Sequence, residues 1–563
     1  MNELIYKHAL HNAVKYEGKA NLGAIIGKVL AEDPDLKSNM KSLGKEVADI
    51  IKKVNSMKLK DQIEELEKIA PELLEEKNIV EERRLPPLPN VKDHVILRVA
   101  PYPSGPLHIG NAKQIIINDE YAKIYKGKLL LVIDDTIGSE EKNIEPEAYD
   151  LIPDGLKWLN VSFDSNIVYK SDRLEIYYKH AEDLIRKGMA YTCKCSSEKL
   201  RENRANRIEC LCRKNKVSDI LEEWHEVLKD KYKQGEIALR LKTSMQHPNP
   251  AFRDRVLFRI SERVHPRVEN KYKVWPMLEF SWAVDDYLLK ITHVIRGKEL
   301  MIESDMERFI WEIFGWKGPE LMHTGLLTIE GVKLSKSKSK SEVKSGKYFG
   351  WDDPRTWSLQ SLRRRGFKVE AIRSFCLSFG VNENESTVSV DKFYAENRKL
   401  VESEANRYFL VEDSVEVEIE DAPKTEIELK LHPDFPERGF RNYITNGMFH
   451  ISRKDFNNIE DGKINRLMDC MNFIKKGNKF MFHSLEYEKF RDAKNKGMII
   501  HYVPKDNCVG FEVLMDNGEI INGVAEDQIK NLKIDDVIQA ERRFFCRLDA
   551  VQNDVYKFWF THK

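Results

Sequence analysis

The spacing of apolar residues divides the chain into regions with different predicted structure. Up to about residue 85, apolar side chains recur at helical spacing, as at Ile63, Leu66 and Ile69, which predicts helices with one apolar face. After Val411 the run VEVEIE alternates apolar and polar side chains, as a half-buried strand does. In FEVLMDNGEIING, Asn517-Gly518 separates two such runs and predicts a hairpin turn. The pattern therefore predicts a helical start and a β-rich end, built as barrels or sandwiches.

Between these regions, short apolar runs alternate with helical patterns. HVILRVA predicts a buried strand, GNAKQIIINDEYAKIYKG a helix that Gly127 can end, and KLLLVID a second buried strand. Strand, helix and strand in about forty residues form a βαβ unit, and such units build parallel sheets. Cysteines and polar helical segments then interrupt this pattern before it resumes, which indicates an insertion.

The predicted organisation is that of a multidomain α/β and β protein with six parts. They are a helical N-terminal extension (1–90), the first half of an α/β domain (91–190), an insertion (191–271), the second half of the α/β domain (272–340), a helical region (341–410) and the β-rich tail (411–563).

Composition and charge exclude several classes of protein. Of the 563 residues, 41% are apolar and 33% charged, which is typical of a globular chain. Lys plus Arg and Asp plus Glu both number 92, so any contact with nucleic acid has to come from local patches. The N-terminus lacks the apolar core of a signal peptide, and no apolar run approaches the roughly eighteen residues of a membrane span. We expect a cytoplasmic monomer with no membrane partner.

A loop rich in proline and glycine, APYPSGPLHIGNAK, joins the first buried strand to its helix. Such a loop is a ready anion site, because the free N–H groups and the dipole of the helix face the ligand. Gly105 and Gly110 let a nucleotide approach the backbone, Pro101 stiffens the loop, and His108 adds a donor that can become cationic. Taken alone, the pattern favours a structural turn with a capping histidine over a nucleotide site.

A second stretch, HTGLLTIEGVKLSKSKSK, changes this balance. Alone, its Lys/Ser run indicates a solvated loop. Paired with the first loop, it resembles the two signatures of class I aminoacyl-tRNA synthetases, HIGH and KMSKS. HPNPAFRD, VDDYLLKITHVIRGKEL and DDPRTWSLQSLRRRGFKVEAI are similar to the glutamyl and glutaminyl group, and the resemblance covers most of residues 94–412. The β-rich tail and the helical extension resemble the archaeal glutamyl-tRNA synthetases rather than the bacterial ones.

The resemblance implies a fold and a reaction. The fold is a Rossmann-type parallel-sheet catalytic domain with an inserted acceptor-end domain, a helical stem-contact region and C-terminal anticodon-binding β-barrels. The reaction is the ATP-dependent attachment of glutamate to tRNA-Glu through a glutamyl-adenylate, with Mg²⁺ accompanying ATP. Whether tRNA-Gln is also charged stays open.

The resemblance also assigns the residues that act on the nucleotide. His108 matches the first histidine of HIGH, Lys336 matches the lysine that reaches the phosphates, and Lys333 supports it. Asn111 replaces the second histidine, and its amide still donates a hydrogen bond but never becomes cationic. The expected catalytic set is His108, Asn111, Lys333 and Lys336. The expected ATP-binding set is Pro101, Gly105, His108, Gly110, Ser335 and Lys336.

For the amino acid, Arg98 and Arg296 match arginines that hold glutamate carboxylates, a task that suits a planar fork. Asp134 matches an acidic residue near the α-amino group. Leu278 replaces a tyrosine and Tyr102 a smaller polar residue, so the detailed shape of the pocket stays open. For Asp134 or Arg296 taken singly, a structural ion pair and a substrate contact are both open interpretations.

Four of the eight cysteines form two close pairs, Cys193 with Cys195 and Cys210 with Cys212. Four thiolates fit a tetrahedral zinc ion, and soft sulfur ligands favour zinc over magnesium. The one-residue spacing is tighter than usual, and free thiols or disulfides are the alternatives. The resemblance agrees with zinc, because glutamyl enzymes of this family often carry it in this insertion. We therefore predict a structural zinc ion.

The sequence leaves two alternative functions open. A glutaminyl-tRNA synthetase would run the same reaction with a neutral side chain, and the cysteine cluster and the N-terminal extension argue against it. A tRNA-binding paralogue without amino-acid activation is the second alternative. Asn111 and Leu278 favour it, whereas the retained His108, Lys336 and Arg98 oppose it.

Overall fold

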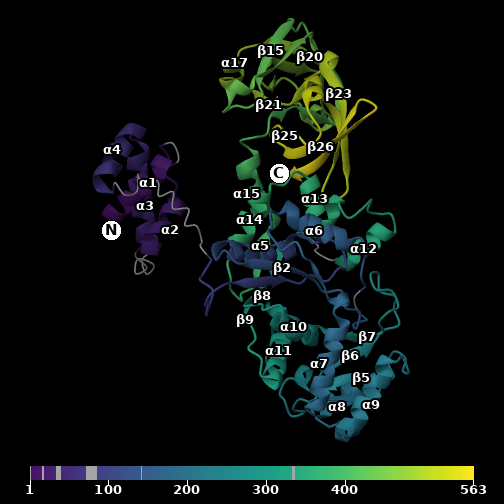
Figure 1. The fold of residues 1–563 in the computed structure, drawn as a ribbon. Coiled ribbons are helices and arrows are strands. Elements are labelled where there is room, and N and C mark those ends of the chain that lie inside the picture. Colours follow the sequence, from purple (N-terminus) through teal and green to yellow (C-terminus); the bar gives the residue numbers. More distant parts are fainter. Residues whose placement is uncertain (1, 16–17, 33–39, 71–84, 141–142, 333–335) are drawn as a thin grey trace. The chain divides into compact units, whose positions relative to one another are not determined.

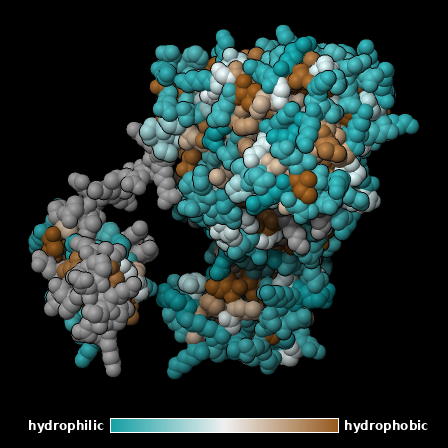
Figure 2. All heavy atoms as spheres, turned by 90° about the horizontal axis from the view of Figure 1, so that it is seen from below, coloured by the Kyte–Doolittle hydropathy of each residue, from teal (hydrophilic) through white to brown (hydrophobic). Residues whose placement is uncertain are grey.

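The computed structural model describes all residues except 1, 16–17, 33–39, 71–84, 141–142 and 333–335 (Figure 1). The chain forms two compact units, Met1–Arg84 and Leu85–Lys563. On the face shown in Figure 2, hydrophilic residues dominate and hydrophobic ones gather in small groups. In the described parts of the chain we find no helix with the length and apolarity needed to cross a bilayer.

The first unit is helical, as predicted. Its helices are α1 (Asn2–Lys15), α2 (Leu22–Glu32), α3 (Met40–Asn55) and α4 (Leu59–Ile69). Each helix contributes a buried apolar face to one core, represented by Ile5, Ile25, Val47 and Leu66. The helical spacing read from the sequence therefore corresponds to real amphipathic helices.

The second unit starts with a parallel α/β core, which confirms the predicted fold class. Its strands are β1 (Ile96–Val99), β2 (Lys128–Ile133), β3 (Val168–Tyr169), β8 (His293–Gly297) and β9 (Glu320–Thr324). β1, β2 and β3 pair in parallel in that order, and β8 pairs in parallel with β9. The N–H of Thr292 donates to the carbonyl oxygen of Ile96 over 2.9 Å, which places β8 beside β1.

Helix α5 (Ile109–Ile124) connects β1 to β2 and ends where the sequence predicts. The N–H of Gly127 donates to the carbonyl oxygen of Ala122 over 2.8 Å. A Cβ atom added to Gly127 would lie 2.3 Å from the carbonyl oxygen of Val95. Only glycine therefore fits between the end of this helix and the segment that precedes β1.

The insertion and its flanking residues form an antiparallel sheet of β4 (Ala190–Cys193), β5 (Ala238–Leu241), β6 (Val256–Ile260) and β7 (Val274–Pro276), in chain order. Its helices are α8 (Ser197–Asn206) and α9 (Val217–Leu228). Buried Trp224, Phe258 and Trp275 share a core with α10 (Leu278–Leu288) and α11 (Met301–Phe314). The insertion is thus packed against the helices that border the cavity described below.

The remaining helices of this unit are spread over the α/β core, the region between the core and the tail, and the tail itself. They are α6 (Ala148–Trp158), α7 (Leu174–Arg186), α12 (Lys336–Lys344), α13 (Leu359–Arg364), α14 (Val369–Leu377), α15 (Val390–Val401), α16 (Arg453–Asn458) and α17 (Tyr487–Arg491). Strands β10 (Leu327–Glu330) and β11 (Ser386–Ser389) pair in parallel beside them.

Two seven-stranded sheets and an antiparallel pair, β15 with β16, make up the described tail, which confirms the β-rich end. The first has the order β12-β25-β26-β27-β23-β24-β13 and the second β21-β18-β19-β20-β14-β17-β22. Strands β23 (Cys508–Leu514) and β24 (Ile520–Glu526) form the predicted hairpin, with Gly518 at a φ of 87° in its turn. The other strands are β12 (Arg407–Tyr408), β13 (Leu410–Glu412), β14 (Ser414–Glu420), β15 (Thr425–Lys430), β16 (Phe440–Thr445), β17 (Met448–Ser452), β18 (Ile464–Leu467), β19 (Asn472–Lys476), β20 (Lys479–Ser484), β21 (Lys496–Ile500), β22 (Tyr502–Pro504), β25 (Val537–Ala540), β26 (Phe544–Gln552) and β27 (Val555–His562).

Candidate active site

A cavity of about 1040 Å³ opens at the carboxyl ends of β1, β2 and β8. In open parallel sheets this edge is where ligands bind, because the loops and helix N-termini converge there. Eight of the residues predicted from the sequence line it: Arg98, Pro101, Tyr102, His108, Asn111, Asp134, Leu278 and Arg296. The chain therefore brings the predicted nucleotide and amino-acid residues to one space.

His108 and Asn111 build the start of α5. His108 is the N-cap residue, and its Nδ1 accepts the N–H of Gly110 over 3.1 Å. The side-chain Oδ1 of Asn111 accepts the backbone N–H of His108 over 3.2 Å, which completes a capping box. Asn111 thus supplies an acceptor that the helix start uses, and it does so without the charge of a second histidine.

The two predicted glycines of this loop do not line the cavity. Gly105 has a φ of 143°, and a Cβ added there would lie 3.0 Å from the ring of Trp351. Gly110 gives its N–H to His108. Their observed roles are close packing and helix capping, and an approach of the nucleotide to either backbone stays a prediction.

The lysine-rich segment is described only in part. Lys333 and Ser335 lie outside the described residues, and so does the side chain of Lys336, which begins α12. Further along this helix, Lys340 lines the cavity and forms an ion pair with Glu145. The N–H of Glu145 donates to the carbonyl oxygen of Pro103 over 2.9 Å. The described part of α12 is therefore attached to the loop that carries His108.

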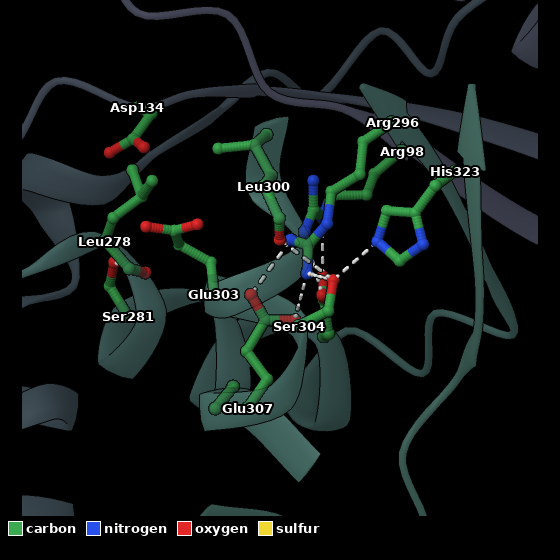
Figure 3. Close-up of polar contacts among 12 residues, drawn as sticks. Arg98, Asp134, Leu278, Ser281, Arg296, Leu300, Glu303, Ser304, Glu307 and His323 are labelled. Carbon is green, nitrogen blue, oxygen red and sulfur yellow. Dashed lines mark hydrogen bonds and ion pairs between the residues drawn. The ribbon is translucent and has the colours of Figure 1, made fainter. Parts of the chain in front are cut away.

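At the amino-acid end of the cavity, where the residues predicted to hold glutamate lie, both predicted arginines form buried pairs with carboxylates (Figure 3). Arg98 donates from Nε and Nη2 to Asp286, over 2.6 and 2.9 Å. Arg296 donates from Nη1 and Nη2 to Glu307, over 2.9 Å each. Burial raises the pKa of the Glu307 carboxyl, and the charge of Arg296 opposes that rise. Sequence reasoning missed both acidic partners.

A further set of contacts fixes the orientation of these two arginines. The guanidinium carbons of Arg98 and Arg296 lie 4.8 and 4.9 Å from the ring centroid of Trp282. Arg296 Nη2 also donates to Ser304 Oγ over 2.6 Å, and that oxygen lies 2.8 Å from His323 Nε2. Among the described residues, Arg296 Nε is buried and has no hydrogen-bond partner. Each guanidinium thus keeps part of its donor capacity outside its carboxylate pair.

Asp134 follows β2 and is already engaged. Its Oδ1 accepts the hydroxyl of Thr136 over 3.2 Å and lies 3.4 Å from Nζ of the buried Lys170. Burial lowers the pKa of Lys170, and the charge of Asp134 opposes that change. Leu278, the first residue of α10, and Tyr102 line the same cavity. Burial raises the pKa of the Tyr102 phenol. Lys170 is a further residue that the sequence did not reveal.

The four clustered cysteines come together in the insertion. Their sulfur atoms all lie within 4.8 Å of one another, and all four are free thiols. Sγ of Cys210 is 3.6 Å from that of Cys193 and 3.3 Å from that of Cys195. Nη1 of the buried Arg240 donates to Cys193 Sγ over 3.6 Å. This donor set fits a tetrahedral zinc ion, and in this structure no disulfide joins these four cysteines.

Comparison with known proteins identifies the family. The model of the catalytic domain of class I tRNA synthetases (E and Q) matches residues 94–402, and the anti-codon binding domain of the same group matches residues 405–483. The chain belongs to this family. The resemblance read from the two loop signatures is thereby confirmed, and every residue that lines the cavity falls inside the catalytic-domain match of this synthetase.

Relatives of this synthetase align from end to end. The chain is 43% identical to the glutamate–tRNA ligase of Pyrococcus furiosus and 41% identical to that of Methanobrevibacter smithii, with 100% of each chain covered. The crystal structure of the glutamate-tRNA synthetase from Elizabethkingia anophelis is 21% identical, with a TM-score of 0.40, and the match covers 55% of this chain and 70% of that one. A structural similarity this low supports no conclusion about the site.

Proposed function

We propose that this synthetase attaches glutamate to tRNA in an ATP-dependent reaction through a glutamyl-adenylate. The observation that carries the proposal is the end-to-end similarity to relatives named glutamate–tRNA ligase. The two buried arginines at one end of the cavity support it, since a dicarboxylate needs more positive charge than an amide. The glutaminyl alternative is not favoured, and tRNA-Glu is the expected partner, with tRNA-Gln left open.

Glutamate would bind through the donors of Arg98 and Arg296 that Asp286 and Glu307 leave over. Nη1 of Arg98 lies outside its pair, and Arg296 lines the cavity although its Nε is buried. Charge-assisted hydrogen bonds to a carboxylate are about twice as strong as neutral ones. A glutamine amide would lose that charge, so the arginines select glutamate.

ATP would bind where α5 begins, beside His108. In the first step a carboxylate oxygen of glutamate attacks the α-phosphorus of ATP and pyrophosphate leaves. In the second, a terminal ribose hydroxyl of tRNA attacks the acyl carbon and AMP leaves. Lys336 and Lys333 would stabilise the charge on the phosphates, as would the N–H groups at the helix start. Mg²⁺ neutralises part of that charge when it accompanies ATP.

We further propose that Cys193, Cys195, Cys210 and Cys212 hold a structural zinc ion. The convergence of four thiols, whose sulfur atoms all lie within 4.8 Å of one another, supports this. Metal analysis of freshly purified, unchelated protein should find about one zinc per chain, and Cys193→Ser should lose it and expose the insertion to proteolysis. Metal-free protein of normal protease resistance would contradict the zinc proposal.

Amino-acid-dependent exchange of pyrophosphate into ATP, with and without tRNA, tests the function. We expect glutamate to support exchange far better than glutamine. Preferred exchange with glutamine would identify a glutaminyl enzyme. A lack of exchange with any amino acid in both conditions, together with tRNA binding, would identify the paralogue without activation.

A further inference from the structure

One buried cation of the insertion forms no ion pair with a carboxylate in the described part of the chain. Arg240 lies in β5, and its side chain is fully buried. Its Nε donates to the backbone carbonyl oxygen of Asp254 over 2.9 Å, and its Nη1 donates to Cys193 Sγ over 3.6 Å. Its Nη2 is buried and has no hydrogen-bond partner among the described residues. A buried cation without a counter-charge strongly destabilises a fold, so this guanidinium needs a negative partner.

The other charged groups around Arg240 do not meet this need. The carboxylate of Asp254 attracts Arg240 but already pairs with Arg213. Arg204 of α8 is a second cation close by, and the two charges repel each other. Because Arg240 is fully buried, a phosphate group of tRNA does not reach it. The counter-charge has to come from inside the insertion, and the group that Arg240 contacts there is the sulfur atom of Cys193.

The cysteine cluster has the opposite need. Four thiolates around one zinc ion carry more negative charge than the ion neutralises. Because Cys193 and Cys210 are buried, water solvates this surplus poorly. The exposed lysines beside the first cysteine pair, Lys194 and Lys199, are each engaged by a carboxylate. Arg240, by contrast, donates directly to a sulfur atom of the cluster.

We propose that Arg240 is the counter-ion of the zinc-loaded cysteine cluster. This inference rests on the zinc site proposed above. Arg240 is a positioning residue that does not ligate the metal. Its charge and its hydrogen bond stabilise the thiolate of Cys193, and a stabilised thiolate holds the ion more tightly. Neutral thiols would leave the guanidinium without a counter-charge, so the pairing favours a loaded cluster over four free thiols.

The proposal also gives a role to the segment HPNPAFRD, residues 247–254. Its last residue, Asp254, holds Arg240 through its backbone carbonyl oxygen and Arg213 through its carboxylate. Arg213 directly follows Cys212 in the second cysteine pair. The segment thus fixes one arginine beside each of the two pairs.

The affinity of the full-length protein for zinc tests the proposal, measured by competition with the chromogenic chelator pyridylazoresorcinol. We expect Arg240→Met to lower the affinity about tenfold to a hundredfold, the usual loss when a group that contacts a metal ligand is removed. At saturating zinc the variant should still bind about one ion per chain. Arg259→Met is the matched control, because it removes an exposed arginine of the neighbouring strand β6, and it should bind zinc as the wild type does.

Two further variants separate the charge of Arg240 from its shape. Arg240→Lys keeps the charge and should recover part of the affinity, whereas Arg240→Gln keeps a donor without the charge and should bind zinc as weakly as Arg240→Met. If Arg240→Met failed to fold, these two variants would decide the question. The proposal is overturned if Arg240→Met binds zinc with wild-type affinity, or if Arg240→Gln recovers the affinity and Arg240→Lys does not. A wild type that binds no zinc would instead refute the zinc site itself, and this inference with it.

Discussion

The two ends of the cavity are built in different ways. At the nucleotide end, the start of α5 is capped locally, since Asn111 accepts a backbone N–H only three positions away. At the amino-acid end, Arg98 pairs with Asp286 across 188 positions of the chain. A local cap contributes about 1 kcal/mol, whereas breaking a buried ion pair costs about 3–5 kcal/mol. The amino-acid end is therefore harder to change without loss of the fold.

The largest effect should come from breaking a buried pair. Asp286→Asn leaves the Arg98 cation buried without its counter-charge, and we expect the free energy of unfolding to fall by about 3–5 kcal/mol. Urea denaturation measures this. The double variant Arg98→Met/Asp286→Leu is the control, because it removes both charges. It should regain most of the stability and still fail to activate glutamate. Equal stability of Asp286→Asn and wild type would show that this end is not held by the pair.

At the nucleotide end, the largest expected effect is on rate and not on stability. Lys336→Ala should lower adenylate formation by roughly two orders of magnitude, the usual loss for one preorganised charge stabiliser. Pyrophosphate exchange measures the rate, and tRNA affinity should change little. Lys347→Ala, at an exposed lysine of the following segment, serves as the control. A wild-type rate in Lys336→Ala would remove this lysine from the mechanism.

The smallest effect should come from the helix cap. Asn111→Ala deletes the acceptor for the His108 N–H, and we expect a loss of about 1 kcal/mol in stability and slower adenylate formation. Asn111→Asp keeps the acceptor and should recover the stability, and Asn111→His should fold and stay active. If Asn111→Ala forms adenylate at the wild-type rate, Asn111 is a structural turn residue and the loop works through His108 and the backbone.

The contrast between local and long-range contacts also explains which features could be predicted from the sequence. His108 as a cap, Gly127 as a helix end and Gly518 in a hairpin all follow from contacts with near neighbours, which local patterns encode. The parallel sheet followed from hydrophobic runs. Gly105 shows the limit of this approach, because the ring packed against it belongs to Trp351, far along the chain.

Long-range pairing explains the residues that were missed. Nothing in the local sequence around Arg98 says which buried carboxylate will face it, because its partner Asp286 lies 188 positions along the chain. Lys170 and Glu307 were missed for the same reason. Family resemblance supplied Arg98 and Arg296 as residues, whereas only the structure shows that both are already paired.

Although both arginines are already paired, we expect them to select a substrate with a negatively charged side chain. The most direct measurement is the ratio of kcat/KM for activation of glutamate and of glutamine by the wild-type protein. A neutral amide would leave buried donors without a charged partner, so we predict a preference for glutamate of about a thousandfold or more. In Arg296→Gln the preference should collapse, and if it persisted the role would pass to Arg98. Comparable activation of the two amino acids by the wild type would contradict the account.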